Sequence, residues 1–316
     1  MDNLTHSLVG ALLGQTGLKR KTGLAMPALI IGANLPDVDA ACFFWLDGLE
    51  HLGFRRGITH GPPALVLLPL VLAGLLYVFD RWQTKRGKRP GGRPPVRFGW
   101  LYALAFIGCL THPALDWLNV YGIRLLEPFS SRWFYGDTLF IIDVWLWGLM
   151  GFATWWSLRQ EKRGGTWRKT ARQALAIGLV YIGVNGWYTS VKANMLQDAF
   201  GGGATVIASP VPGAFWDREG LIGHAPNRWS TAPTDRGTLH LEGDPITSQP
   251  CRWPGEVADS TDAEVRAFLF WSRAPFAERA PDGSVLLRDA RFYDPRARDR
   301  FTVELPDIRC EELPAN

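Results

Sequence analysis

Six histidines and aspartates in the first 116 residues stand inside or beside strongly apolar segments, where polar groups are uncommon. They are His6, Asp37, Asp39, His60, His112 and Asp116. His112 and Asp116 are four residues apart, so on a helix they project from one face and can bind the same ion. Asp37 and Asp39 follow Pro36, beside which an unwound backbone can aim both carboxylates inward. This pattern indicates a metal site.

The combination of imidazole and carboxylate groups points to a particular chemistry. Neutral imidazole plus carboxylate is a usual ligand set for zinc, and more carboxylate-rich versions suit manganese or magnesium. An ion with open coordination positions polarises a phosphoryl or acyl oxygen and activates water near neutral pH. The residues therefore predict a divalent metal cofactor, zinc first with manganese or magnesium as alternatives, and a hydrolase.

Four aspartates, namely Asp37, Asp39, Asp116 and Asp143, fall inside apolar segments at an insertion cost of ~2.5 to 3.5 kcal/mol each. This cost needs compensation by pairing, by a metal or by water. Purely structural roles are the alternatives: His6 as a helix cap, His60 as a contact of lipid headgroups, Asp143 as the partner of Arg124 or Arg132, and Asn119 and Tyr121 as hydrogen-bonding groups between helices.

Apolar segments must position these side chains. Residues 61–79 run 19 positions without a charge, which is enough to cross a hydrocarbon core of ~30 Å. The other candidates are 24–46, 98–122, 138–158 and 173–191, with a shorter stretch at 4–18. We therefore expect an α-helical multi-pass membrane domain with five to six spans over residues 1–191.

Lysine and arginine set the expected orientation. The connections at 19–21, 80–97 and 159–172 hold 3, 7 and 6 of them, whereas 47–60 and 123–137 hold two each. By the positive-inside bias the first three are cytoplasmic, and the six polar residues converge on the outer leaflet. A short Pro/Gly-rich cytoplasmic loop accounts for the basic run 80–97, so nucleic acid is not an expected partner.

The composition changes after residue 191. Residues 1–191 have a charge balance of +9 and residues 192–316 one of −5, and the mean hydropathy of −0.03 averages these unlike halves. We expect 192–316 to be a small β-rich (α+β) domain in the periplasm or outside the cell, where a Cys251–Cys310 disulfide is permitted. Its predicted elements are strands at 204–208, 238–241, 284–287 and 301–305 and a helix at 260–271 capped by Ser260.

Four short motifs resemble those of the YdjM-type family of predicted membrane-bound metal-dependent hydrolases. They are Met1-Asp2-Asn3-Leu4-Thr5-His6, Leu35-Pro36-Asp37-Val38-Asp39, Arg56-Gly57-Ile58-Thr59-His60, and His112-Pro113-Ala114-Leu115-Asp116 running into Asn119-Val120-Tyr121-Gly122. The family often has His before Arg-Gly and Ser after Thr-His, where this chain has Arg55 and Gly61. The ordered His and Asp set is also distantly similar to zinc-dependent phospholipase C and related zinc nucleases.

The resemblance implies a multi-pass protein of the bacterial inner membrane with a metal site. The expected metal ligands are His6, Asp39, His60, His112 and Asp116, and either Asp37 or Asp39 is the expected catalytic base. Supporting roles are expected for Asp2, Thr59, Asn119, Tyr121 and Asp143. If the family's missing His holds a second metal, this chain binds only one.

The expected substrate is a phosphoester or a lipid-linked molecule, because the site opens where headgroups lie. Membrane lipid is an expected partner, and nothing in the sequence names a protein partner for the C-terminal domain. Two other functions remain as alternatives. One is a transporter or channel that uses the same carboxylates, and the other is a membrane-anchored interaction protein whose helices are a scaffold.

Overall fold

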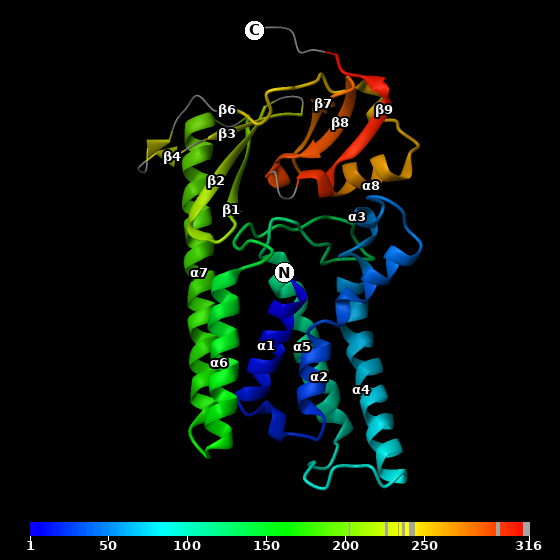
Figure 1. Ribbon diagram of the computed structural model, residues 1–316, viewed down its shortest axis with the longest axis vertical. Helices are drawn as coiled ribbons and strands as arrows, with labels where there is room; N and C mark the ends of the chain where they lie inside the picture. Colours follow the sequence, from blue (N-terminus) through cyan, green and yellow to red (C-terminus); the bar gives the residue numbers. More distant parts are fainter. Residues whose placement is uncertain are drawn as a thin grey trace. The chain divides into compact units, whose positions relative to one another are not determined.

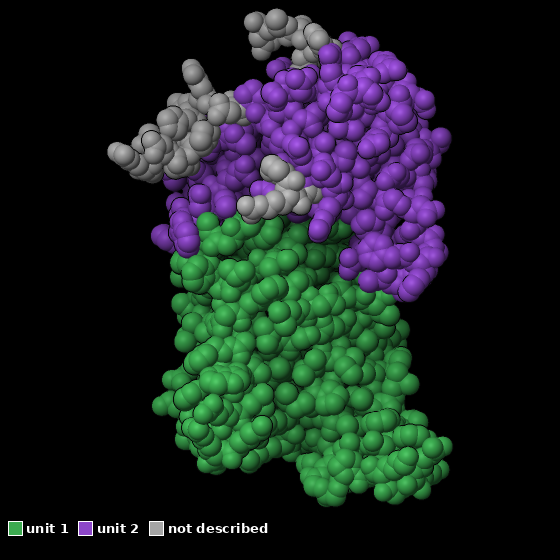
Figure 2. Space-filling view, viewed as in Figure 1, with its two compact units in different colours: residues 1–39, 56–186, 212–215 green, residues 40–55, 187–211, 216–316 purple. Residues whose placement is uncertain are grey.

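The computed structural model describes residues 1–201, 203–224, 227–232, 234–235, 238–239, 244–294 and 298–311. The chain forms two compact units, coloured separately in Figure 2. The first unit comprises residues 1–39, 56–186 and 212–215, and the second comprises 40–55, 187–211 and 216–316. The six polar residues singled out above all lie in the first unit.

The first unit is built from helices (Figure 1). In chain order they are α1 (Asn3–Gln15), η1 (Leu18–Arg20), α2 (Ala25–Gly32), η2 (Leu35–Phe44), η3 (Ile58–His60), α4 (Pro62–Lys85), α5 (Phe98–Trp117), α6 (Val144–Lys162) and α7 (Trp167–Phe200). The last part of η2 and the last turns of α7 belong to the second unit. The multi-pass helical fold predicted for this region is thus present.

Three of these helices, α4, α5 and α7, are long and apolar enough to cross a membrane. The pair α2 and η2 is bent by 54° and passes the same test as one broken span, which gives up to four spans among the described residues. The 13 residues of α1 fall short of the ~20 that a spanning helix needs. On α4, Leu67, Val71, Leu75 and Val78 form an exposed apolar stripe, as a lipid-facing helix requires.

Glycines hold α2 against both α1 and α5. A Cβ atom on Gly10 of α1 would lie 2.7 Å from the carbonyl oxygen of Leu29, and one on Gly108 of α5 would lie 2.5 Å from the same oxygen. A Cβ atom on Gly32 would lie 2.6 Å from the Ala105 carbonyl oxygen. Small residues permit this close backbone approach, which is a usual device of membrane helices. The packing therefore brings the end of α2, and the η2 segment after it, between α1 and α5.

The chain unwinds after α2, where the sequence predicted an unwound backbone next to Pro36. The α-helix ends at Gly32, and residues 35–44 form a 3-10 helix that carries Asp37 and Asp39. The tighter 3-10 turn and the bend direct this segment away from the α2 axis. Asp37 consequently faces the histidines of α1 and α5, and Asp39 faces His60 of η3.

The second unit is built from short antiparallel strands, the helix α8 (Ala263–Trp271) and the last turns of α7. A four-stranded sheet has the order β1-β2-β3-β6, with β1 (Thr205–Val211), β2 (Ala214–His224), β3 (Arg228–Ala232) and β6 (Asp244–Pro245). A three-stranded sheet has the order β7-β8-β9, with β7 (Pro275–Arg279), β8 (Ser284–Asp289) and β9 (Val303–Arg309), and β4 (Thr234–Asp235) pairs with β5 (Thr238–Leu239). The β-rich (α+β) prediction for the C-terminal region is confirmed.

Residues 40–55 join this unit from far away in the sequence. They include the short helix α3 (His51–Phe54), which packs on α8. The Leu49 backbone N–H donates a 2.8 Å hydrogen bond to Glu264. Trp271 and Phe268 of α8 are fully buried, and the Trp271 ring stacks on Phe292. Cys251 and Cys310 form the disulfide that the sequence permitted.

The bounds of two predicted elements need correction, and a third element is described only in part. The helix predicted from Ser260 begins at Ala263, because Asp262 is its cap and accepts hydrogen bonds from Glu264 N and Val265 N. The strand predicted at 301–305 begins at Val303, since residue 301 ends a 3-10 turn. The predicted strand at 238–241 is described only for 238–239, and residues 240 and 241 lie outside the described residues.

Candidate metal centre

Four elements of the first unit meet at one cluster of polar side chains. His6 comes from α1, Asp37 and Asp39 from η2, His60 from η3, and His112 and Asp116 from α5. The three histidines and Asp116 are fully buried, Asp39 is 4% exposed and Asp37 is partly buried. All six residues that the sequence selected therefore converge, although they come from segments up to 110 positions apart.

Asp116 is the centre of the cluster. Its Oδ1 lies 3.3 Å from His6 Nε2, and its Oδ2 lies 3.6 Å from His112 Nε2 and 3.7 Å from His60 Nε2. The predicted one-face arrangement of His112 and Asp116 on a helix is confirmed. One carboxylate thus gathers three imidazoles around it.

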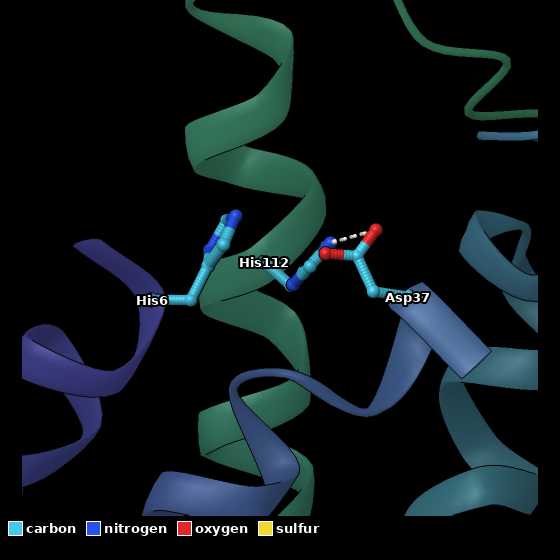
Figure 3. Close-up of side chains that lie close together, drawn as sticks. All are labelled: His6, Asp37 and His112. Carbon is cyan, nitrogen blue, oxygen red and sulfur yellow. Dashed lines mark ion pairs between the residues drawn. The ribbon is translucent and has the colours of Figure 1, made fainter. Parts of the chain in front are cut away.

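The ring of His112 is held in a defined orientation. Its Nδ1 lies 2.7 Å from the carbonyl oxygen of Ala33, at the break after α2. Because a carbonyl oxygen only accepts, Nδ1 carries the proton, and the lone pair of Nε2 is directed to Asp116 and to Asp37 Oδ1 at 3.7 Å. Figure 3 shows His6, Asp37 and His112 reaching toward one another from three elements. The His6 and His112 rings are stacked, with their centres 3.8 Å apart.

The ring of His60 is oriented in the same way by a different route. The Thr59 hydroxyl donates to Asp39 Oδ2 at 3.2 Å and lies 3.0 Å from His60 Nδ1. A carboxylate accepts the hydroxyl proton, so the hydroxyl oxygen accepts from His60 Nδ1–H, and His60 Nε2 keeps its lone pair. Asp39 also accepts a 2.8 Å bond from the backbone N–H of Arg56. Asp39 and Thr59 therefore lie behind His60, on the side away from Asp116.

Two groups of three residues have ligand atoms within 4.8 Å of one another. One consists of His6, Asp37 and His112, and the other of His60, His112 and Asp116. Ligands at ~2.0 to 2.1 Å from a tetrahedral ion are about 3.4 Å apart, close to the 3.3 to 3.7 Å distances around Asp116. Both groups need the single lone pair on His112 Nε2, so they can serve one ion but not two at once.

Several donor atoms of the cluster are buried without a hydrogen-bond partner. The Nε2 atoms of His6, His60 and His112 are buried and have no hydrogen-bond partner in the described part of the chain. Buried polar atoms are nearly always partnered, and orphans need a specific explanation such as an ion. These atoms are the ones that a metal would take, so the residues present fit a divalent metal.

Arg56 is a site residue that the sequence reasoning missed. Its Nε lies 3.1 Å from Asp116 Oδ2, and its Nη1 donates to Asn119 Oδ1 at 3.1 Å and to the Gly122 carbonyl at 3.2 Å. The guanidinium also lies over the Tyr121 ring at 4.4 Å. Arg56 has a φ of 56°, a left-handed conformation that is uncommon outside glycine. The amino group of Met1, which contacts Asp116, was missed as well.

The expected supporting residues fall into two sets. Asn119 and Tyr121 hold Arg56, and Asn119 Oδ1 also accepts from the Tyr121 backbone N–H. Asp2 instead caps α1 through Leu4 N and Thr5 N, and its Oδ2 accepts from Trp147. Asp143 caps α6 and accepts a 2.9 Å bond from the Tyr181 hydroxyl. Asp2 and Asp143 thus act on helix ends near the cluster and pair with none of its histidines.

The two departures from the family pattern also have positions in the structure. A Cβ atom on Gly61 would lie 1.8 Å from the carbonyl oxygen of Glu127, so the loop after α5 fills the space that a serine side chain would need. Arg55 lies in the second unit, with its guanidinium 5.5 Å from the centre of the Phe43 ring. Neither position adds a ligand to the cluster.

Comparison with known proteins covers the same part of the chain. Residues 1–191 match the model of a family described as YdjM inner membrane protein. The chain is also 24% identical over 141 residues to the uncharacterized protein YfhP of Bacillus subtilis (strain 168), a match that covers 42% of this chain and 39% of YfhP. No solved structure matches the chain significantly. Since the family match includes every residue of the cluster and more than half of the chain, this protein belongs to the YdjM inner membrane protein family.

Proposed function

We propose that this protein is a membrane-embedded, metal-dependent hydrolase that acts on a phosphoester or a lipid-linked substrate. One observation carries the proposal. Three imidazoles and the Asp116 carboxylate converge in a buried cluster, and the Nε2 atoms of all three histidines lack hydrogen-bond partners among the described residues. A structural role alone would leave these imidazole nitrogens buried without a hydrogen-bond partner, at a cost of about 1 to 3 kcal/mol each.

We place one ion at His60, His112 and Asp116, whose ligand atoms lie within 4.8 Å of one another, with His6 beside them at 3.3 Å from Asp116. When bound, the ion would polarise a substrate oxygen and activate water, with zinc the expected metal and manganese or magnesium the alternatives. Asp37 is the most exposed of the cluster's carboxylates and is the proposed general base. Asp39 orients His60 through Thr59.

Arg56 supports an anionic substrate. Its guanidinium is held by Asn119, Gly122 and the Tyr121 ring, next to the carboxylate that would bind the ion. A rigid guanidinium beside a metal matches the oxygen geometry of a phosphoryl group and is suited to stabilise its developing charge. This charge favours a phosphoester over a neutral ester.

The outer leaflet is the proposed position of the site. The basic connections after α1, α4 and α6 lie at one end of the first unit (Figure 1), and the positive-inside bias would place that end in the cytoplasm. The cluster lies at the start of α1 and the end of α5, which is the other end of these helices. With α6 as a further pass the count would reach five spans, and the 13-residue α1 is short for a sixth. The Cys251–Cys310 disulfide supports an oxidising compartment for the C-terminal domain.

The test is hydrolysis of phospholipid by the full chain in detergent, measured as released phosphate monoester. We expect activity that a chelator removes and added zinc, manganese or magnesium restores. The Asp37→Asn variant should retain the metal and lose at least ~100-fold in kcat, the lower range for general-base catalysis. His51→Ala, a histidine in the second unit, is the matched control. Full activity of Asp37→Asn would refute the assigned base.

A further inference from the structure

An open, shallow cavity of about 580 Å³ lies at the end of the first unit where its basic connections meet, away from the metal centre. It is formed by the turn between α1 and α2 and by the loop after α4, which lie together at the lower end of Figure 1. Its wall combines three cations with apolar side chains: Lys19, Arg20 and Arg93, with Leu24, Met26 and Pro27. This mixture suits a ligand with an anionic head and an apolar neighbour.

Backbone and side-chain hydrogen bonds build the wall of the cavity. The Arg97 backbone N–H donates to the Thr22 hydroxyl at 2.8 Å, and the Gly23 N–H donates to the Pro95 carbonyl at 3.2 Å. Thr22 is 1% exposed, and a Cβ atom on Gly23 would lie 2.5 Å from the Pro94 carbonyl oxygen. The two loops are therefore tied to each other, and the cavity between them has defined walls.

The cations of the wall are only partly neutralised. Lys19 pairs with Glu161, and Arg93 shares Asp80 with Arg89. Arg20 is exposed and makes no ion pair with any residue that the structure describes, and its guanidinium lies over the Trp167 ring at 5.3 Å. The cavity consequently has a net positive charge that an anion would balance.

Aromatic residues indicate the depth of the cavity in the membrane. Lys21 lies 5.0 Å from the centre of the Trp100 ring, and Trp167 is contacted by Lys19 and Arg20. Tryptophan is enriched at the level of lipid headgroups, and basic pockets between membrane helices bind anionic headgroups. The apolar side of the wall would then face the glycerol and the first acyl methylenes.

We propose that this cavity binds the phosphate of an anionic membrane phospholipid, with Arg20 as its free cation. The lipid would fix the turn between α1 and α2 against the loop after α4. The proposal is independent of the hydrolase function, because no residue of the metal centre lines the cavity.

The test uses the full chain in neutral detergent and a fluorescent phosphatidylglycerol, with phosphatidylcholine and inorganic phosphate as competitors. We expect phosphatidylglycerol to displace the probe, and phosphatidylcholine and inorganic phosphate to do so poorly. Arg20→Gln should weaken binding about fivefold, the usual contribution of one cation near anionic lipid. Lys88→Gln removes the same charge from the same basic end but outside the cavity, and should change affinity by about twofold or less. Arg20→Lys should retain most of the affinity.

Three results would overturn the proposal. If Arg20→Gln and Lys88→Gln lose equal affinity for the lipid, the lipid is attracted by the general charge of the surface and not bound at a specific site. Displacement by inorganic phosphate as effective as that by phosphatidylglycerol would mean a site for soluble anions. If phosphatidylcholine displaces the probe as well as phosphatidylglycerol does, the cavity does not distinguish lipids by the charge of the headgroup. Arg20 and Lys88 are both exposed, so the variants at these positions should keep the melting temperature of the parent. The binding measurements then compare folded proteins.

Discussion

Replacing Thr59 by valine tests whether Asp39 acts on the metal through His60. The Thr59 hydroxyl donates to Asp39 Oδ2 at 3.2 Å and lies 3.0 Å from His60 Nδ1, and valine keeps the shape but removes both bonds. At about 1 kcal/mol for each bond, the ring orientation loses about 2 kcal/mol, which is about thirtyfold in metal affinity. This value lies within the ~10- to 100-fold range known for groups that orient metal ligands.

The assay is a competition titration of the apo protein with a zinc chelator of known affinity, which gives the metal Kd of each variant. Thr84→Val is the matched control, because the Thr84 hydroxyl donates to the Asp80 carbonyl inside α4 and lies outside the metal centre. We expect Thr84→Val to leave the Kd unchanged. An unchanged Kd in Thr59→Val, or an equal loss in Thr84→Val, would refute the reasoning that Asp39 and Thr59 orient His60.

Three further predictions concern packing, substrate and pH. Gly108→Val should lower the melting temperature and reduce the free energy of unfolding by about 1 to 3 kcal/mol, because its Cβ would lie 2.5 Å from the Leu29 carbonyl oxygen. Gly99→Val on the same helix has open space around its Cβ and should leave the melting temperature unchanged. Arg56→Gln should reduce kcat/KM for a phosphoester by at least ~100-fold, as for loss of one transition-state donor, while a neutral ester substrate should be much less affected. Desolvation by burial would raise the pKa of Asp289, but the Arg291 charge and hydrogen bonds from Arg291 and Ser272 outweigh it and hold the pKa below 3.8. The ionised Asp289 therefore stabilises the fold fully above pH 3.8, and this stabilisation is lost as the pH falls through the lower pKa of the folded state. Hydrogen-exchange protection of β8 should decline only in that acidic range. A decline already near neutral pH would contradict this prediction.

Local spacing and membrane depth predicted which residues meet in the cluster. His112 and Asp116 share a helix face by their four-residue spacing, and the break at Pro36 follows from proline chemistry. The convergence of His6 and His60 on them followed from charge bias in the loops, because membrane helices permit few arrangements once their directions are set.

Roles that depend on long-range packing could not be predicted in the same way. Asp39 and Asp37 are two residues apart, yet only contacts with Thr59 and His112 distinguish the residue behind His60 from the one facing the ion. Arg56 reaches the site because its backbone is left-handed, and no local sequence pattern predicts that conformation. Asp143 is the N-cap of α6. An N-cap and a metal ligand can both lie in apolar surroundings, so the sequence does not distinguish these two roles. The docking of residues 40–55 on α8 depends on surfaces more than 200 residues apart.

Stoichiometric metal analysis of the purified full chain shows whether the buried His and Asp cluster binds a divalent ion. Zinc, manganese and magnesium are measured in parent protein prepared without chelators, beside the His112→Ala, Asp116→Ala double variant and the His51→Ala control. We expect about one divalent ion per chain in the parent and the control, since both ligand groups share His112 Nε2, and none in the double variant. Metal-free parent protein, or metal retained by the double variant, would contradict the assignment of a metal centre to these residues.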